Sequence, residues 1–202
     1  MTKLSISLII PVYDEAGILP ELVGSIHAAL NDQPFDWEVI FIDDGSKDDS
    51  FAILKSLAKD DPSRIAVVGL RRNFGQTTAI AAGIDYAKGD VIVLMDADMQ
   101  NDPSDIPFLI SKIDEGYDVV SGWRADRKDT YLTRILPSRI ANKLISWVTG
   151  VHLHDYGCTL KAYRRESLTG FRLYGDMHRF IPAYASHVGA NIIEVKVKHH
   201  TR

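Results

Sequence analysis

The chain has 202 residues, which fits one domain, and a hydrophobic content of 46% allows a sizeable core without disulfides. The formal net charge of -4 gives no general attraction to nucleic acid, so we exclude nucleic acid as a partner. A single cysteine, Cys158, excludes an internal disulfide, and no Cys/His cluster has the spacing of zinc ligands. Any anionic partner must therefore be held by a local group of Arg and Lys.

The first apolar run, 4–12, predicts a buried strand and not a signal peptide. It has no basic leader and no small-residue cleavage site, and it is interrupted at Pro11. No run in the chain reaches the roughly 18 to 20 apolar residues that a membrane span requires. We therefore expect that this chain does not itself cross a bilayer.

Short apolar runs alternate with helical patterns along the first 123 residues. The predicted strands are 4–12, 37–43, 65–70, 90–96 and 117–123, and the predicted helices are 17–30, 47–60, 76–88 and 104–115. Continuous Val, Ile and Leu strands separated by helices predict an α/β fold with a mainly parallel sheet covered on both faces.

The pattern changes after Trp123, although no linker or repeat marks a domain boundary. A polar stretch leads into an amphipathic segment at 131–149, and the chain closes with a strand-like run at 191–200. We interpret residues 1–202 as one domain, in which 1–123 form a nucleotide-binding half and 124–202 an acceptor half.

Acidic side chains follow three of the predicted strands, in the segments 11–15, 43–46 and 96–100. In an open parallel sheet, ligands bind at the carboxyl ends of the strands. Three carboxylate groups at one edge repel each other unless a cation or hydrogen-bond donors lie between them.

The third of these segments has the pattern of a cation site. Asp96, Asp98 and the amide of Gln100 offer oxygen ligands that suit Mg²⁺ or Mn²⁺, and such ions commonly complete their shell with substrate phosphates. The pattern therefore favours a diphosphate ligand. The alternative interpretation is that these are ordinary polar residues of a loop.

The other acidic segments are more ambiguous. Asp43 and Asp44 offer acceptors for a nucleobase or ribose, or they form a turn followed by a helix N-cap. Glu15 has a similar choice between ligand contact and a place near a helix start. The loop 71–76 contains a glycine that lets backbone approach a ligand, but neither a Walker A motif nor G-x-G-x-x-G is present, which disfavours ATP and NAD.

The second half contains a candidate anion site. Arg124 ends the fifth strand, and Arg134 and Ser138 share one helix face if 131–149 is helical. Arginine forks with a hydroxyl suit a phosphate, although solvated arginines are a common alternative. The same basic, Trp-containing segment is typical either of a helix at a membrane surface or of one packed on a core.

Taken in order, these motifs resemble the family 2 glycosyltransferases of the dolichyl-phosphate mannose synthase and undecaprenyl-phosphate sugar transferase group. The matching stretches are PVYDEA, IDDGSKDDS, RNFGQTTAIAAGI, GDVIVLMDADMQNDP, SGWRADRKD, DYGCTLKAYRR and HRFIPAYA. The resemblance implies an inverting enzyme of the GT-A fold, dependent on Mg²⁺ or Mn²⁺. It would transfer a sugar from a UDP- or GDP-sugar to a polyprenyl phosphate at the cytoplasmic face of the cell membrane, for cell-envelope glycan or lipid modification.

The resemblance also implies roles for individual residues. The nucleotide would be held by Pro11, Tyr13, Glu15, Asp43 and Asp96, the metal by Asp96, Asp98 and Gln100, and the acceptor phosphate by Arg124, Arg134, Ser138 and Arg202. Asp98, Arg124 and Asp155 would be the catalytic residues, with Asp155 orienting the acceptor or the sugar. Similar proteins continue past this point with a Gly-x-Ser-Lys-Tyr-like stretch and often membrane helices, so we expect this chain to stop before a membrane-associated segment; a homo-oligomer is left open.

Two other functions stay open at this point. One is a transferase of the same fold that acts on a polysaccharide or another hydroxyl acceptor, and the other is a non-catalytic paralogue that binds a nucleotide sugar. A lipid phosphomonoester has a second pKa of about 6 and is a substantial nucleophile at neutral pH, whereas a hydroxyl needs a base. The arginines therefore favour the phosphate acceptor.

Overall fold

A seven-stranded sheet in the order β3-β2-β1-β4-β6-β5-β7 forms the centre of the computed structural model, which describes residues 3–125, 145–147, 149–170 and 172–201. The strands are β1 (Ser5–Val12), β2 (Asp36–Asp43), β3 (Ile65–Gly69), β4 (Val91–Leu94), β5 (Val119–Trp123), β6 (Lys161–Arg164) and β7 (Ile192–Lys196). Every pairing between these strands is parallel except those of β6, which runs antiparallel to both β4 and β5.

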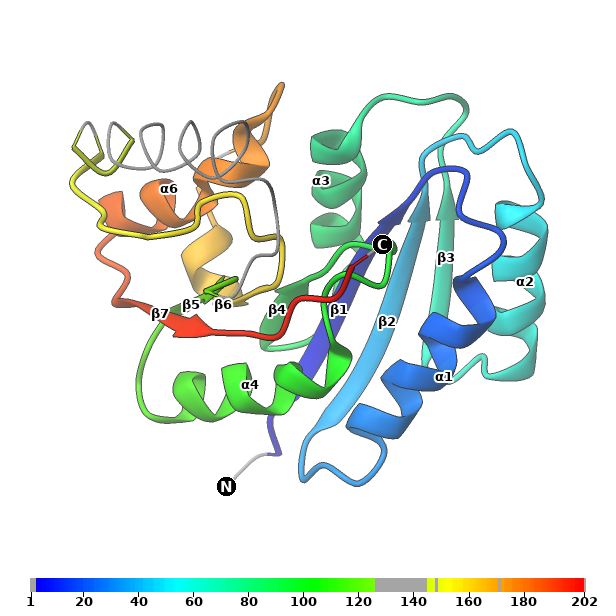
Figure 1. The fold of residues 1–202 in the computed structure, drawn as a ribbon, viewed down its shortest axis with the longest axis horizontal. Coiled ribbons are helices and arrows are strands. Elements are labelled where there is room, and N and C mark those ends of the chain that lie inside the picture. The colour runs from blue at the N-terminus through cyan, green and yellow to red at the C-terminus, as the bar shows by residue number, and fades with distance from the viewer. Residues whose placement is uncertain (1–2, 126–144, 148, 171, 202) are drawn as a thin grey trace.

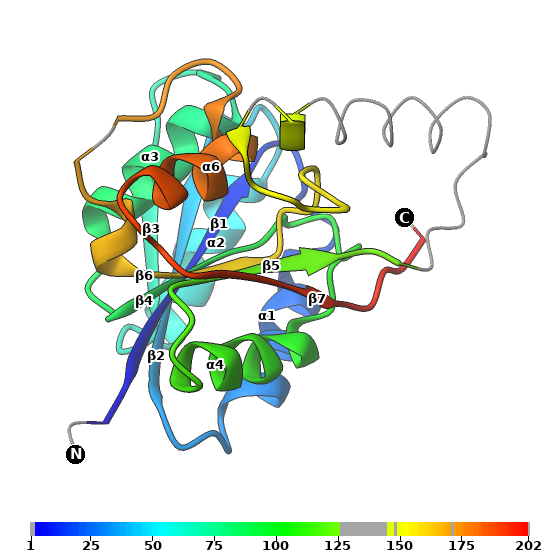
Figure 2. The same cartoon turned by 90° about the vertical axis from the view of Figure 1, so that its left-hand side faces the viewer.

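Helices cover both faces of this sheet (Figures 1 and 2). The α-helices are α1 (Leu19–Leu30), α2 (Ser50–Asp60), α3 (Gln76–Tyr86), α4 (Ile106–Asp114) and α6 (Ile181–His187), and the short 3₁₀ turns are η1 (Pro103–Asp105), η3 (Arg165–Leu168) and η4 (Met177–Phe180). Helices α1, α2 and α4 pack on one face, and α3 and α6 on the other.

The alternation of side chains along β1 builds the two cores. Leu8 and Ile10 point into the core beneath α1 and α4, while Ile9 points into the core beneath α3. Gly83 lets α3 approach β1 closely, because a Cβ at this position would overlap the side chain of Ile9. A buried sheet of this kind needs apolar residues on both faces of each central strand, which the continuous apolar runs supply.

The antiparallel strand β6 determines what reaches the carboxyl edge of the sheet. Its first residue, Lys161, lies in register with Leu94 of β4 and with Ser121 of β5. Because β6 runs in the opposite direction, the segment that precedes it lies beside the ends of β4 and β5. Residues 155–160 therefore lie between the acidic turn after β4 and Arg124 after β5.

The α/β class, the mainly parallel sheet, the five predicted strands and the four predicted helices are confirmed, with ends that differ by a few residues. The strand-like run at 191–200 contains β7. Strand β6 and helix α6 were not predicted, and both are short enough to give little periodic signal. Most of the predicted helix at 131–149 falls on residues 126–144 and 148, which lie outside the described residues. Within the described part of the chain, no helix has both the length and the apolarity to span a bilayer.

Candidate active site

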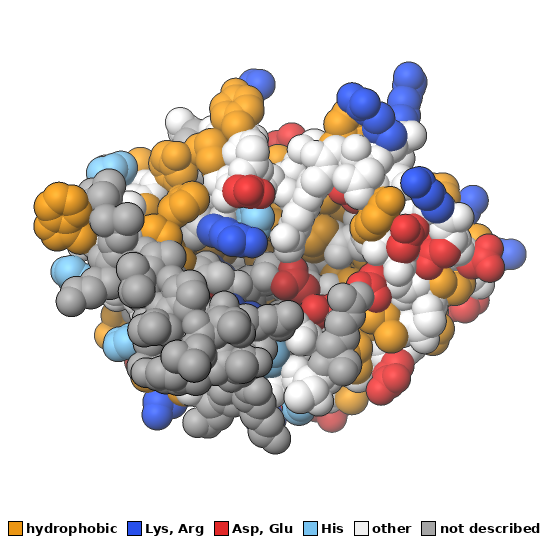
Figure 3. Space-filling model, turned by 45° about the horizontal axis from the view of Figure 1, so that its top comes forward, with side chains coloured by type: hydrophobic (Ala, Val, Ile, Leu, Met, Phe, Trp, Pro, Cys, Tyr) orange, Lys and Arg blue, Asp and Glu red, His pale blue; other side chains and the backbone are white. Residues whose placement is uncertain are grey.

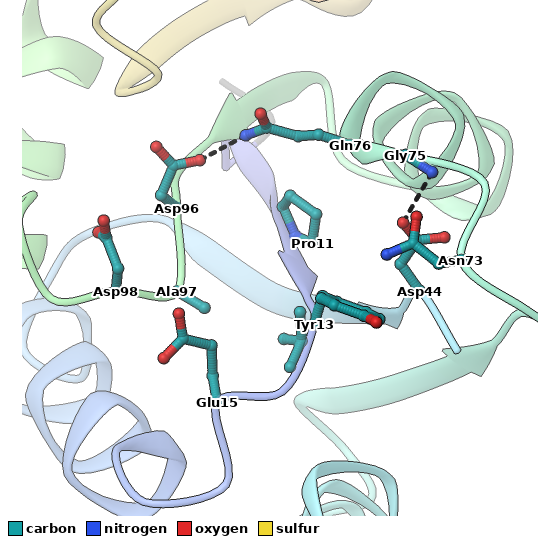
Figure 4. A pocket seen from close by; sticks show the side chains of 11 residues that line it. Pro11, Tyr13, Glu15, Asp44, Asn73, Gly75, Gln76, Asp96, Ala97 and Asp98 are labelled. Atoms are coloured by element: carbon teal, nitrogen blue, oxygen red, sulfur yellow. Dashed lines mark hydrogen bonds between the residues drawn. The ribbon is translucent and has the colours of Figure 1, made fainter. Parts of the chain in front are cut away.

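A pocket of about 280 Å³ opens at the carboxyl edge of the sheet, where the segments after β1, β2, β3 and β4 meet. Acidic side chains gather in this hollow, with Lys and Arg side chains around it (Figure 3). Glu15, Asp96 and Asp98 lie on one side of the pocket, and Tyr13 and Asn73 lie on the other (Figure 4). The edge predicted from the sequence is thus the edge that carries the pocket.

The end of β1 and the turn after it bring Pro11, Tyr13 and Glu15 to the pocket. Asp14 adopts a left-handed backbone conformation with φ of 54°, and its Oδ1 accepts a hydrogen bond of 2.6 Å from the backbone N–H of Lys47. A non-glycine residue at positive φ needs such support from its surroundings. The β1 turn is therefore fixed against the segment after β2, and Tyr13, with 38% of its surface exposed, remains available to a ligand.

The two aspartates after β2 have different surroundings. Asp43 is buried; its Oδ2 accepts from the backbone N–H of Ser46 at 3.2 Å, and its Oδ1 has no hydrogen-bond partner among the described residues. Asp44 lines the pocket, and its carboxylate accepts from the backbone N–H groups of Phe74 and Gly75, both at 2.8 Å. Asp44 thus holds the 71–76 loop in place, while Asp43, which we predicted to contact the nucleotide, is not among the lining residues.

The acidic turn after β4 presents two carboxylates to the pocket. Asp96 accepts from Gln76 Nε2 at its Oδ1 and from Thr159 Oγ1 at its Oδ2, both at 2.6 Å. Asp98 Oδ1 accepts from the backbone N–H of Gln100 at 3.1 Å, next to Met99 at a φ of 60°. The Gln100 side chain, predicted as a third metal ligand, is not part of the lining.

The electrostatics of Asp96 fit a divalent cation. Burial raises the pKa of Asp96 and repulsion from Asp98 adds to it, while the Thr159 hydrogen bond and the charges of Arg124 and Lys161 act in the opposite direction; the pKa stays above its ordinary value. A cation between the two carboxylates would remove this repulsion. No group of three or more His, Cys, Asp and Glu side chains suited to a metal occurs among the described residues. The remaining ligands would be diphosphate oxygens and water, as is usual for Mg²⁺.

Arg124 and Asp155 form a two-pronged ion pair next to this site. Asp155 Oδ2 accepts from Arg124 Nε at 2.7 Å, its Oδ1 accepts from Arg124 Nη2 at 3.0 Å, and the two side chains are 15% and 5% exposed. Burial would raise the pKa of Asp155, but the hydrogen bonds and charge of Arg124, together with the charge of Lys161, more than offset this, so the pKa lies below its ordinary value. Asp155 is therefore an ionised group that fixes the orientation of Arg124.

Three residues assigned to the acceptor phosphate, Arg134, Ser138 and Arg202, lie outside the described residues. The segment that leads to Arg202 is nevertheless placed: the backbone N–H of His200 donates to the carbonyl of Gln100 at 2.9 Å. His200 Nε2 also lies 3.2 Å from Asp102 Oδ2. The end of the described chain therefore lies beside the acidic turn after β4.

Sequence reasoning missed three residues around Asp96. Gln76 was considered only as part of a glycine loop, and Thr159 and Lys161 lie in or before the unpredicted strand β6. A signal was present: Lys161 stands between Leu160 and Ala162, and a lysine flanked by apolar residues in a strand needs a partner for its charge.

A family model supports the resemblance of the motifs. The model described as Glycosyl transferase family 2 matches residues 7–171. The chain is 44% identical to a dodecaprenyl-phosphate galacturonate synthase of Rhizobium johnstonii, over 99% of this chain and 60% of the relative. It is 43% identical to an undecaprenyl-phosphate 4-deoxy-4-formamido-L-arabinose transferase of Enterobacter sp., over 100% and 63%. The chain thus spans less than two thirds of the length of these relatives.

Solved structures show the same fold at lower sequence identity. Glucosyl-3-phosphoglycerate synthase of Mycobacterium tuberculosis has a TM-score of 0.70 at 22% identity, with 98% of this chain and 73% of that chain covered. A mannosyltransferase of Pyrobaculum calidifontis, solved with GDP-Man and Mn²⁺, has a TM-score of 0.70 at 19% identity, with 97% and 56% covered. These likenesses confirm the expected fold.

Proposed function

We propose that this chain, which belongs to glycosyl transferase family 2, carries the catalytic site of an enzyme that transfers a sugar from a nucleoside-diphosphate donor to a polyprenyl phosphate. The observation that carries the proposal is the arrangement of charged side chains in the segments that follow β4 and β5. Two carboxylates suited to a metal diphosphate lie next to an arginine whose charge acts on Asp96 and whose guanidinium is oriented by Asp155.

The donor would lie across the pocket. Asp96 and Asp98, with Mg²⁺ or Mn²⁺, would hold the diphosphate, and the nucleoside would lie toward Tyr13, where an exposed ring can stack on a base. Asp43 is buried and does not line the pocket, but one of its carboxylate oxygens has no partner among the described residues, so we keep its contact with the nucleoside as part of the proposal. A structural neighbour solved with Mn²⁺ and UDP-glucose supports a divalent cation and a nucleotide sugar as the ligands, by analogy of fold.

The acceptor phosphate would lie at Arg124, together with Arg134, Ser138 and Arg202. Relatives named for transfer to dodecaprenyl and undecaprenyl phosphate support a lipid phosphate as the acceptor. The names of these relatives differ in the sugar, so we leave the transferred sugar open. The acceptor is a membrane lipid, so we place the enzyme at the membrane surface and, as the motif resemblance implies, on its cytoplasmic face.

The proposed reaction needs alignment more than it needs a base. A phosphate oxygen of the acceptor attacks the anomeric carbon, the bond from that carbon to the diphosphate oxygen breaks, and the configuration inverts. A bound divalent cation would neutralise charge on the departing diphosphate. Arg124 holds the acceptor phosphate in line, and Asp155 keeps Arg124 in one orientation.

A hydroxyl acceptor is disfavoured by the state of Asp155. A hydroxyl must lose a proton to a base, and Asp155 is the carboxylate of the acceptor half that the motif match assigns to catalysis. Both of its oxygens accept from Arg124 and its pKa is lowered, so it is a weak proton acceptor. The geometry thus favours an acceptor that is already ionised.

Radiolabelled transfer from a panel of UDP- and GDP-sugars to undecaprenyl and dolichyl phosphate, with Mn²⁺ or Mg²⁺, tests the proposal. The complete native protein should form a lipid-phosphate sugar, and Asp98→Asn and Arg134→Ala should each lose it. Asp36→Asn, at an exposed carboxylate paired with Lys3, is the matched control and should retain activity. Metal-independent transfer, or transfer only to hydroxyl acceptors, would refute the proposal.

A further inference from the structure

Lys161 is a buried lysine at the start of β6, two residues after Thr159, whose hydroxyl contacts Asp96. Its residue is 3% exposed, and its Nζ donates to the backbone carbonyl of Tyr156 at 3.2 Å and to the carbonyl of Cys158. Burying an ammonium group is costly unless hydrogen bonds and opposite charges compensate it. We assigned no substrate role to this residue from the sequence, so the presence of its charge in the core needs a physical explanation.

The carbonyls that bind Lys161 belong to a segment with contacts on both sides of the site. Within residues 155–159, Asp155 accepts two hydrogen bonds from the Arg124 side chain, and Thr159 donates to Asp96 Oδ2 at 2.6 Å. The first of these contacts faces the proposed acceptor side and the second faces the proposed metal side. Lys161 binds the two carbonyls that lie between them in sequence.

The start of this segment is held by a residue other than Lys161. Glu194 of β7 accepts from the backbone N–H of Asp155 at 2.9 Å and from that of His154 at 3.0 Å, and its side chain is 9% exposed. The start of the segment is therefore fixed to the sheet by Glu194. Its middle is held by Lys161, whose own backbone is paired with β4 and β5.

We propose that Lys161 is a positioning residue whose buried ammonium holds the 155–159 segment so that Thr159 aligns Asp96 while Asp155 aligns Arg124. One side chain thereby sets the geometry of the metal diphosphate and of the acceptor arginine together. The inference rests on the proposed function for its effect on turnover. Its effect on metal and nucleotide binding does not depend on which acceptor is used.

The test compares two matched substitutions in the complete native protein. Lys161→Met keeps a long unbranched side chain and removes the donors. Arg165→Met is the control. Arg165 also donates from its side chain to a backbone carbonyl, from Nε to Gly89 O at 2.8 Å, but it lies at the opposite end of β6. Free Mn²⁺ is measured by electron paramagnetic resonance during titration with UDP or GDP, and unfolding is measured in urea.

We expect Lys161→Met to weaken the Mn²⁺–nucleotide affinity by about tenfold or more, the range typical for groups that orient metal ligands. Arg165→Met should lower stability and leave this affinity unchanged. Wild-type affinity in Lys161→Met would overturn the proposal and leave Lys161 a structural residue. If Lys161→Met does not fold, Lys161→Gln, which keeps a shorter N–H donor, is measured in its place. Wild-type Mn²⁺–nucleotide affinity in that variant would likewise overturn the proposal.

A double-mutant cycle tests the route through Thr159. If Lys161 acts on Asp96 through this residue, Thr159→Val alone should weaken Mn²⁺–nucleotide binding, and adding Lys161→Met should weaken it little further. Effects of the two substitutions that simply multiply would overturn the route. Because the readout is binding, a failure here is distinct from a failure to transfer sugar, which would refute the proposed function alone.

Discussion

The Asp155 carboxylate receives three hydrogen bonds from Arg124, two from the guanidinium and one from the backbone N–H. The pair is largely withdrawn from solvent, so removing either partner would leave a buried charge without its hydrogen-bonded counter-charge. A substitution in the Arg124–Asp155 pair should therefore change both the function of the site and the stability of the fold.

Asp155→Asn should lower the free energy of unfolding by roughly 2 to 4 kcal/mol, because it leaves Arg124 without its counter-charge. It should also raise the KM for the lipid phosphate more than that for the donor. Urea unfolding and steady-state kinetics measure the two effects. As a comparison, Glu115→Gln at the exposed pair with Lys112 should change stability by less than about 1 kcal/mol; an equal loss at both sites would contradict the assignment.

His178 of η4 supplies a pH prediction. The ring is half-buried, with Nδ1 2.7 Å from Thr77 Oγ1; burial lowers its pKa to about 4, and the charge of Arg179 contributes in the same direction. The unfolded chain takes up a proton near the ordinary value of about 6.5, whereas the folded chain does so only near 4. This contribution to stability is therefore present above about pH 6.5 and is lost as the pH falls toward 4.

Between pH 7 and pH 5, His178 should account for a loss of roughly 1 kcal/mol, discounted for the exposed part of the ring. Urea unfolding of His178→Gln at both pH values should show a correspondingly smaller decrease on acidification. The exposed His152 offers a control, since His152→Gln should keep the decrease of the wild type. A decrease in His178→Gln as large as in the wild type would show that this ring is not the titrating group.

At the scale of residues, the sequence predicted the kinds of groups at the site better than their contacts. Pro11, Tyr13, Glu15, Asp96 and Asp98 line the pocket, because each lies at or just after the end of an apolar strand and so emerges at the same edge. The partners Gln76 and Thr159 could not be predicted. They reach Asp96 from 20 and 63 residues away, and no local pattern encodes such pairings.

At the scale of elements, two helical glycines differ in what they contact. Gly24 in α1 has open space where a Cβ would lie, whereas a Cβ at Gly83 in α3 would overlap Ile9 of β1. Gly24→Ala should therefore raise the free energy of unfolding by about 0.5 to 1 kcal/mol, through helix propensity. Gly83→Ala should lower it by about 1 to 3 kcal/mol, because α3 must move away from the sheet.

The same two variants connect packing with the pocket. Helix α3 begins at Gln76, which contacts Asp96, so a displaced α3 should also weaken nucleotide binding. Calorimetric titration with nucleotide should show a loss for Gly83→Ala and none for Gly24→Ala. Equal stability changes of one sign in both variants would contradict the packing described here.

Strand β6 marks the limit of element prediction from this sequence. It has four residues, it runs against its neighbours, and its first side chain is a lysine, so it lacks the continuous apolar run that identified the other strands. Its pairing is decided by tertiary contacts between β4 and β5. The most informative segment of the site, 155–159, depends on this strand.

At the scale of the whole molecule, charge is separated along one edge of the sheet. The segments after β1 and β4 bring carboxylates, and the segment after β5 brings an arginine. A metal diphosphate and a phosphate monoester repel one another, and this separation provides a place for each. The net charge of -4 does not indicate this separation, whereas the residues that follow each predicted strand do.

The nature of the bond that the enzyme makes tests the central claim most directly. The complete native protein is incubated with Mn²⁺, the donor that it accepts and a short-chain polyprenyl phosphate, and the products are followed by ³¹P and ¹H NMR. We predict that the phosphomonoester signal is converted into that of a sugar phosphodiester, with inversion at the anomeric carbon and release of nucleoside diphosphate. A phosphomonoester that stays unchanged while nucleoside diphosphate is released and the sugar is found on a hydroxyl group would contradict the account.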